Sequence, residues 1–142
     1  MTTLSIVFVL LLAFQAKHYL ADYPLQRRYM LGKFKDDWGF FLPLLAHVSV
    51  HALGTFLIAC WFGVGKAILL AIFDATVHFV MDRIKASKKY LGRFKPLTAE
   101  TAAIATPIQW KHNDYFWWSL GVDQMVHHLT HYAIIFAIVE QW

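Results

Sequence analysis

The stretch D-A-T-V-H-F-V-M-D, residues 74–82, places three ionisable side chains four residues apart inside an apolar segment. A spacing of four puts Asp74, His78 and Asp82 on one face of a helix, one turn apart. His and Asp are costly inside an apolar helix unless they are paired or bind a ligand. The stretch therefore predicts a helix that buries a polar site on one face.

The same spacing recurs in three further apolar segments. The pairs are His18 with Asp22, His47 with His51, Asp123 with His127, and His127 with His131. The chain has six His/Asp pairs at this spacing, whereas random placement of its 15 His and Asp residues would give roughly one or two. This repetition predicts one shared site, and a metal ion is its simplest occupant.

Composition indicates a membrane protein. The 142-residue chain is 58% hydrophobic and 15% charged, whereas soluble domains have about 45–50% apolar and about 25% charged residues. The single cysteine, Cys60, cannot form an internal disulfide and excludes a cysteine-based metal framework. We expect one integral-membrane domain over residues 1–142.

Four apolar segments have close to the roughly 20 residues that a helix needs to cross a bilayer. We predict an all-α, four-transmembrane-helix bundle with spans at about 4–23, 42–62, 66–85 and 115–139. Pro24 is expected to kink or end the first span, which has a polar extension towards Met30, and Gly63 and Gly65 are expected to form a tight turn. Residues 86–114 form a basic connector, interpreted as an interfacial or re-entrant segment or as a lid over the site.

The basic residues predict an orientation. Eleven of the 13 Lys and Arg residues lie between the first two spans, at the end of the third span or in the connector 86–114. By the positive-inside rule these regions are cytoplasmic, and both termini lie on the outer side. Binding to anionic lipid headgroups explains the net charge of +4 better than binding to nucleic acid. Lys85 is expected to snorkel to the membrane edge. Tryptophans near segment ends predict interfacial belts: Trp38, Trp61, Trp110, Trp117, Trp118 and Trp142.

On this topology, the four polar sets all fall in the cytoplasmic half of the bilayer, because a helix rises about 1.5 Å per residue. Imidazole nitrogens and carboxylate oxygens suit zinc, manganese or iron(II). The predicted ligands are His18, Asp22, His47, His51, His78, Asp82, Asp123 and His127. Eight ligands exceed the four of one zinc site, so two ions bridged by a carboxylate are also considered. Asp74 is expected to orient a histidine ring or to make a helix contact, and His128 and His131 are interpreted as hydrogen-bonded helix contacts.

Four motifs in order carry a family resemblance: H-Y-L-A-D-Y-P-L-Q (18–26), H-V-S-V-H (47–51), H-F-V-M-D-R-I-K (78–85) and D-Q-M-V-H-H (123–128). From about residue 10 to 137, the chain resembles a domain-of-unknown-function family of small bacterial and phage inner-membrane proteins. More distantly, it is similar to membrane-bound metal-dependent hydrolases. The resemblance implies a metal site at the same eight residues and an inner-membrane location. With the orientation from the positive-inside rule, both termini are then predicted to be periplasmic. The resemblance supplies no substrate.

The leading functional hypothesis is a metal-dependent hydrolase that acts at the cytoplasmic interface on a phosphorylated lipid-like substrate. Asp22 or Asp123 is then the candidate catalytic carboxylate that takes a proton from metal-bound water. One alternative is a metal-ion or proton transporter or channel, because buried Asp and His chains serve such pathways. Another is a non-enzymatic phage or bacterial membrane factor with a structural metal site. The sequence leaves a homo-oligomer open.

Overall fold

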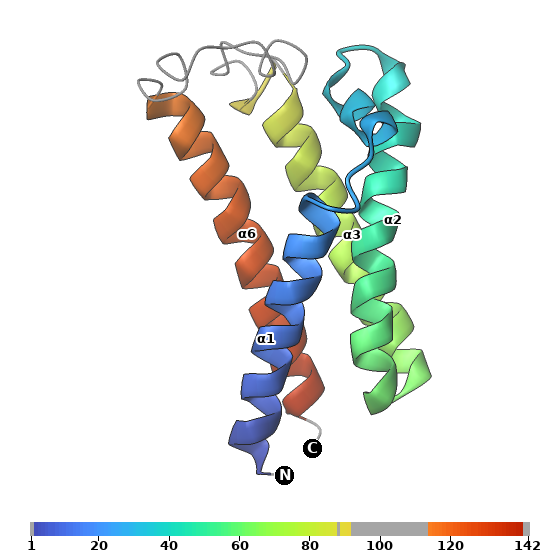
Figure 1. Cartoon of the computed structure of the whole chain (residues 1–142), viewed down its shortest axis with the longest axis vertical. Helices are drawn as coiled ribbons and strands as arrows, with labels where there is room; N and C mark the ends of the chain where they lie inside the picture. Colours follow the sequence, from blue (N-terminus) through green and yellow to red (C-terminus); the bar gives the residue numbers. More distant parts are fainter. Residues whose placement is uncertain (1, 88, 92–113, 141–142) are drawn as a thin grey trace.

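The computed structural model describes residues 2–87, 89–91 and 114–140, with the backbone alone at 115 and 116. All regular secondary structure in these residues is helical, which confirms the all-α prediction. The long helices are α1 (Thr3–Asp22), α2 (Phe41–Ala59), α3 (Val64–Ala86) and α6 (Asp114–Val139) (Figure 1). Their bounds lie within a few residues of the four predicted segments.

A side-chain cap and a proline account for the two ends of helix α1. The Thr2 side chain accepts a hydrogen bond from the Ser5 backbone N–H at 3.2 Å, which caps the first turn. The helix ends at Asp22, two residues before Pro24, which lacks the N–H needed to continue the helical hydrogen bonds. The predicted polar extension towards Met30 is wrong: the chain turns and then forms the 3-10 helix η1 (Arg28–Phe34).

Helices α2 and α3 form a hairpin. A short 3-10 helix, η2 (Trp38–Phe40), leads into α2, and Pro43 lies in the first turn of α2, where backbone N–H groups have no helical partner. The hairpin turns through η3 (Cys60–Phe62) and Gly63, whose φ of 119° favours glycine. Gly65 already belongs to α3, so the expected glycine turn uses Gly63 alone.

The helices alternate in direction. The N-terminal end of α1 and the C-terminal end of α6 lie at one end of the bundle, and the start of α2 and the end of α3 lie at the other (Figure 1). Helix α2 packs along α3, and α6 contacts both α1 and α3. This arrangement lets each helix contribute side chains at the same depth.

The bundle interior is divided along its length. An apolar core occupies the end that carries the termini; it consists of Leu10, Phe14, Ala59, Ala67, Ile134, Ile135 and Ile138. Towards the other end, the buried side chains are mostly His, Asp and Lys. Burial of apolar surface therefore holds one end, and the polar end needs interactions of another kind.

Three helical stretches are long and apolar enough to cross a membrane: Thr3–Asp22, Trp38–Phe62 and Val64–Ala86. Within the described residues α6 does not reach their hydropathy, so the prediction of four such spans is corrected to three. The physical reason is that α6 carries Asp123, Gln124, His127, His128 and His131 in its central turns.

The described tryptophans are exposed near helix ends. Trp38 and Trp61, at opposite ends of α2, are 82% and 87% exposed, as expected of side chains at two membrane interfaces. Trp117 and Trp118, in the first turns of α6, are also exposed. Trp110, Trp142 and most of the basic connector, residues 92–113, lie outside the described residues.

Gly54 tests the packing of α1 on α2. A Cβ at Gly54 would lie 2.7 Å from Cγ of the buried Lys17 side chain, whereas a Cβ at Gly65 would meet nothing within 4 Å. We expect Gly54→Ala to lower the free energy of unfolding by about 1–3 kcal/mol, as overpacking does. Gly65→Ala should lower it by nothing measurable, because alanine is the better helix former. Thermal unfolding in detergent measures both, and equal midpoints for the two variants would contradict the packing.

Candidate metal centre

The four-residue spacing brings together one buried set of side chains. We name it the His/Asp cluster, and its members are His18, Asp22, His47, His51, Asp74, His78, Asp82, Asp123, His127 and His131. It includes all eight predicted ligands, and every member except Asp22 is buried. Because α1, α2, α3 and α6 alternate in direction, side chains far apart in the sequence meet at one depth.

The first group of ligand atoms crosses from α1 to α2. Asp22 Oδ1 lies 3.1 Å from His51 Nε2 and 3.4 Å from His47 Nε2. Asp22 Oδ2 lies 3.2 Å from His18 Nε2, one turn earlier on α1. One ligand atom from each of Asp22, His47 and His51 falls within 4.8 Å of the others, a spacing compatible with one metal ion.

Two further groups involve α3 and α6. Asp82, Asp123 and His127 form one, and His18, His78 and His131 form the other, with the same 4.8 Å limit between their ligand atoms. Asp82 Oδ2 also lies 3.1 Å from His47 Nε2, so the groups are contiguous. His131, expected to make only a helix contact, therefore lies among candidate ligands.

The imidazole rings contact one another. The centroids of His78 and His127 are 4.0 Å apart with their planes 3° from parallel, and the centroids of His51 and His78 are also 4.0 Å apart. The centroids of His18 and His127 are 5.4 Å apart, with their planes tilted by 55°. Neutral imidazole is the form that binds metals, and several such rings converge here.

Several buried ring nitrogens lack a hydrogen-bond partner among the described residues. His78 Nδ1 donates to the Asp74 backbone carbonyl at 3.0 Å, which leaves the unpartnered Nε2 as the lone-pair nitrogen. Both ring nitrogens of His127 lack a partner, although the residue is 1% exposed. An anchored nitrogen opposite a free one is how metal-binding histidines are commonly held.

Three lysines pair with three of the four cluster aspartates. Lys17 Nζ lies 2.7 Å from Asp74 Oδ2, and Lys33 Nζ lies 2.8 Å from Asp82 Oδ2. Lys85 pairs with Asp123, so the prediction that Lys85 snorkels to the membrane edge is wrong. The reason is that a buried carboxylate within reach stabilises the ammonium group better than the membrane edge does.

Sequence analysis missed the role of these lysines. The position of Lys17 could have predicted its role, because a lysine inside an apolar helix needs a charged or polar partner. The position of Lys33 gave no such signal, since it lies in a connector. It reaches the cluster only because η1 packs on α2 and α3.

Asp74 lies at the deep end of the cluster and serves several partners. Its Oδ2 accepts hydrogen bonds from Lys17 Nζ and from Thr55 Oγ1, each at 2.7 Å. Its Oδ1 lies 3.1 Å from Nδ1 of His78. The contact with His78 fits the predicted role of orienting a histidine ring, and the contacts with Lys17 and Thr55 fit the predicted helix contact.

Two polar side chains of α6 lie beside the cluster, and one of them, His128, makes the helix contact that the sequence predicted. His128 Nδ1 lies 3.1 Å from Gln15 Nε2, a contact between α6 and α1 that lies away from the cluster carboxylates. Gln124 Nε2 donates to Asp123 Oδ2 at 3.2 Å, and its Oε1 lies 3.0 Å from His18 Nε2. Gln124 thus links a carboxylate to a histidine.

The fold and site define a small helical membrane protein with a buried cluster of His, Asp and Lys. The chain belongs to the family described as "Protein of unknown function (DUF3307)", which matches residues 6–142. This confirms the family resemblance. No curated protein and no solved structure matches the chain.

Lys33 tests the electrostatic balance of the cluster. Lys33→Ala would leave Asp82 buried without its ammonium partner, and we expect a loss of about 3–5 kcal/mol in the free energy of unfolding. Lys35→Ala is the matched control, because Lys35 is exposed on the same connector. Thermal unfolding in detergent compares them, and a Lys33→Ala midpoint as high as that of Lys35→Ala would contradict the pairing.

Proposed function

We propose that the chain is a membrane-embedded, metal-dependent hydrolase acting on a phosphorylated lipid-like substrate. One observation carries the proposal: eight ring nitrogens on the six cluster histidines are buried without a hydrogen-bond partner among the described residues. A buried polar atom without a partner costs about 1–3 kcal/mol. Each neutral imidazole has one lone-pair nitrogen, and a bound cation would satisfy those within its reach. The nitrogen and oxygen donors suit zinc, manganese or iron(II).

Charge balance favours a single divalent ion. The cluster holds four aspartates, and three of them pair with lysines, which leaves one negative charge if the histidines are neutral. One divalent cation brings the sum to +1, whereas two bring it to +3. Excess buried charge is costly, so we propose one ion rather than the two that the ligand count alone allows.

The group of Asp22, His47 and His51 suits that ion best. Its carboxylate has no lysine partner, whereas Lys33 and Lys85 occupy the carboxylates of the group formed by Asp82, Asp123 and His127. A divalent ion bound there would polarise a phosphoryl oxygen and activate a water molecule.

Asp22 is also the better candidate for taking up a proton. Its side chain is 17% exposed, whereas those of Asp74 and Asp123 are 0% exposed and that of Asp82 is 3% exposed. His18, one turn away, lies within 3.2 Å of Asp22 Oδ2 and orients that oxygen. Asp123, the other catalytic candidate, is held by Lys85 and Gln124.

The bundle provides an orientation for this chemistry. Arg27, Arg28 and Lys35 are exposed in the connector between the end of α1 and the start of α2. Asp22 of the His/Asp cluster is the last residue of α1, next to this connector. We place this connector at the cytoplasmic face of a bacterial inner membrane and the termini at the periplasmic face, following the positive-inside rule. An anionic headgroup at that interface would then meet both the basic residues and the cluster.

A metal or proton transporter is a second candidate, favoured by one feature. Lys17, Asp74 and Thr55 form a buried hydrogen-bonded set that continues from the cluster towards the apolar half of the bundle. Buried ionisable chains of this kind serve proton pathways. Among the described residues the set ends at the apolar core, which favours the hydrolase.

Metal content tests the site. We expect protein purified in mild detergent without added metal to carry about one equivalent of zinc, manganese or iron by mass spectrometry, by the charge balance above. His47→Ala and His51→Ala should each lose it, because each removes a donor of the group that we propose holds the ion. His128→Ala is the matched control and should retain the metal, since His128 pairs with Gln15. An absence of metal after reconstitution, or equal retention by all three variants, would contradict the site.

Phosphate release tests the activity. We expect the metal-loaded protein to release inorganic phosphate from phosphatidic acid or a polyprenyl phosphate in mixed micelles. Asp22→Asn should slow release by about a hundredfold or more, because it removes the carboxylate that we propose both binds the ion and takes up the proton. The exposed Asp114→Asn should leave the rate unchanged. Bound metal with no release from the wild type, together with proton or metal flux in liposomes, would favour transport instead.

A further inference from the structure

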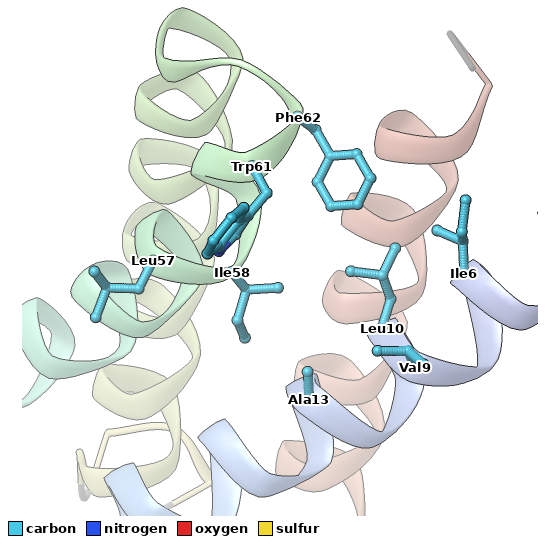
Figure 2. Close-up of a pocket in the computed structure, with 8 residues that line it drawn as sticks. All are labelled: Ile6, Val9, Leu10, Ala13, Leu57, Ile58, Trp61 and Phe62. Carbon is cyan, nitrogen blue, oxygen red and sulfur yellow. The ribbon is translucent and has the colours of Figure 1, made fainter. Parts of the chain in front are cut away.

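An apolar groove runs along the seam between α1 and α2. Its first part, about 700 Å³, lies between residues 6–13 of α1 and residues 57–62 around the end of α2 (Figure 2). A second hollow, about 290 Å³, continues along the same seam towards Leu25. The two hollows share Ala13, Leu57 and Ile58, so they form one groove.

The groove is longer than one bilayer leaflet. It follows α1 from Ile6 to Ala21, a rise of roughly 23 Å at about 1.5 Å per residue. The hydrocarbon core of a bilayer is about 30 Å thick, so one leaflet is about 15 Å. A fatty-acyl chain confined to one leaflet would leave part of the groove unfilled, whereas a longer hydrocarbon chain would fill it.

One end of the groove approaches the candidate metal group. Ala21 and Val50 line this end, and the next residues along their helices, Asp22 and His51, contact each other across the same seam at 3.1 Å. Lys17 lines the groove as well, and Gly54 leaves room for its side chain.

Positive charge gathers beyond the same end. Arg27 and Arg28 are exposed just after Leu25, the last groove residue on this side. The apolar groove is thus followed by the candidate metal group and then by exposed arginines. A ligand with a long apolar chain and a phosphate headgroup matches this sequence, since the chain would fill the groove and the phosphate would lie near Asp22 and the arginines.

We propose that the α1–α2 groove binds the chain of a polyprenyl phosphate, with the phosphate at the Asp22, His47 and His51 end. This inference deepens the proposed function, because it names the substrate class, and it rests on that function for the position of the phosphate. The groove itself is a separate feature, and a substitution away from the cluster tests it.

Ala13 is the position to substitute, because it lines both hollows. Ala13→Phe would place a ring at the point where they join. Ala133→Phe is the matched control, since Ala133 is exposed on α6. The full chain in mild detergent is mixed with a long polyprenyl phosphate or with dipalmitoyl phosphatidic acid, and bound lipid is measured by native mass spectrometry.

We expect the wild type and Ala133→Phe to retain the polyprenyl phosphate, and Ala13→Phe to bind it about tenfold more weakly. Phosphatidic acid should bind the wild type more weakly than the polyprenyl phosphate. Equal binding of the polyprenyl phosphate by both variants would overturn the groove as its site. Equal retention of the two lipids by the wild type would overturn the assignment to a chain longer than one leaflet.

Metal content, measured on the same samples, separates this inference from the proposed function. Ala13→Phe should keep its metal while it loses the lipid, which supports the groove as a chain site outside the metal group. Binding that is lost with Ala13→Phe but accompanied by no phosphate release in the wild type would support the groove and refute the hydrolase. Loss of both lipid and metal in Ala13→Phe would overturn the separation of the two sites.

Discussion

The pairing of buried lysines with buried aspartates is the constraint on which the rest of the structure depends. Removing a carboxylate from water costs several kcal/mol, and four of them lie in the interior of this bundle. The ion pair of Lys17 and Asp74 links α1 to α3. The pair of Lys33 and Asp82 links η1 to α3, and the pair of Lys85 and Asp123 links α3 to α6. Each pair joins different elements, so the ion pairs set how the helices meet at the polar end, where little apolar surface is available for packing.

Asp22 differs from the other three aspartates, and this difference organises the site. Its neighbours are His18, His47 and His51 rather than a lysine, and its side chain is the most exposed of the four. A carboxylate without a fixed countercharge, surrounded by imidazoles, is suited to a cation that binds from outside. The lysine pairs thus do more than stabilise the bundle. They leave Asp22 as the one cluster carboxylate without a lysine partner, and we propose that a metal ion binds there.

The α1–α2 seam combines the polar and apolar halves of the protein. The candidate metal group bridges this seam at one end, and the apolar groove follows it towards the other. Gly54 contributes to both features. Because it has no Cβ, the Lys17 side chain fits against it, and Lys17 contacts Asp74 and also lines the groove. The proposed hydrolase and the proposed chain site therefore depend on the same packing of α1 against α2.

The sequence by itself determined the helices, their approximate ends and the family, because periodicity and apolar length are local properties that a single chain displays. The spacing of four also predicted which His and Asp residues would share a face, as at His78 and Asp82. Only the tertiary structure decided that Lys33 reaches Asp82, that Lys85 turns inward and that His131 joins the other rings. The two lysine contacts join residues at least 38 positions apart, such as Lys85 and Asp123, so their pairing depends on how elements distant in the sequence align in depth. The polar residues that make α6 part of the site also lower its hydropathy, which is why three of the described helices, and not the predicted four, are apolar enough to cross a membrane.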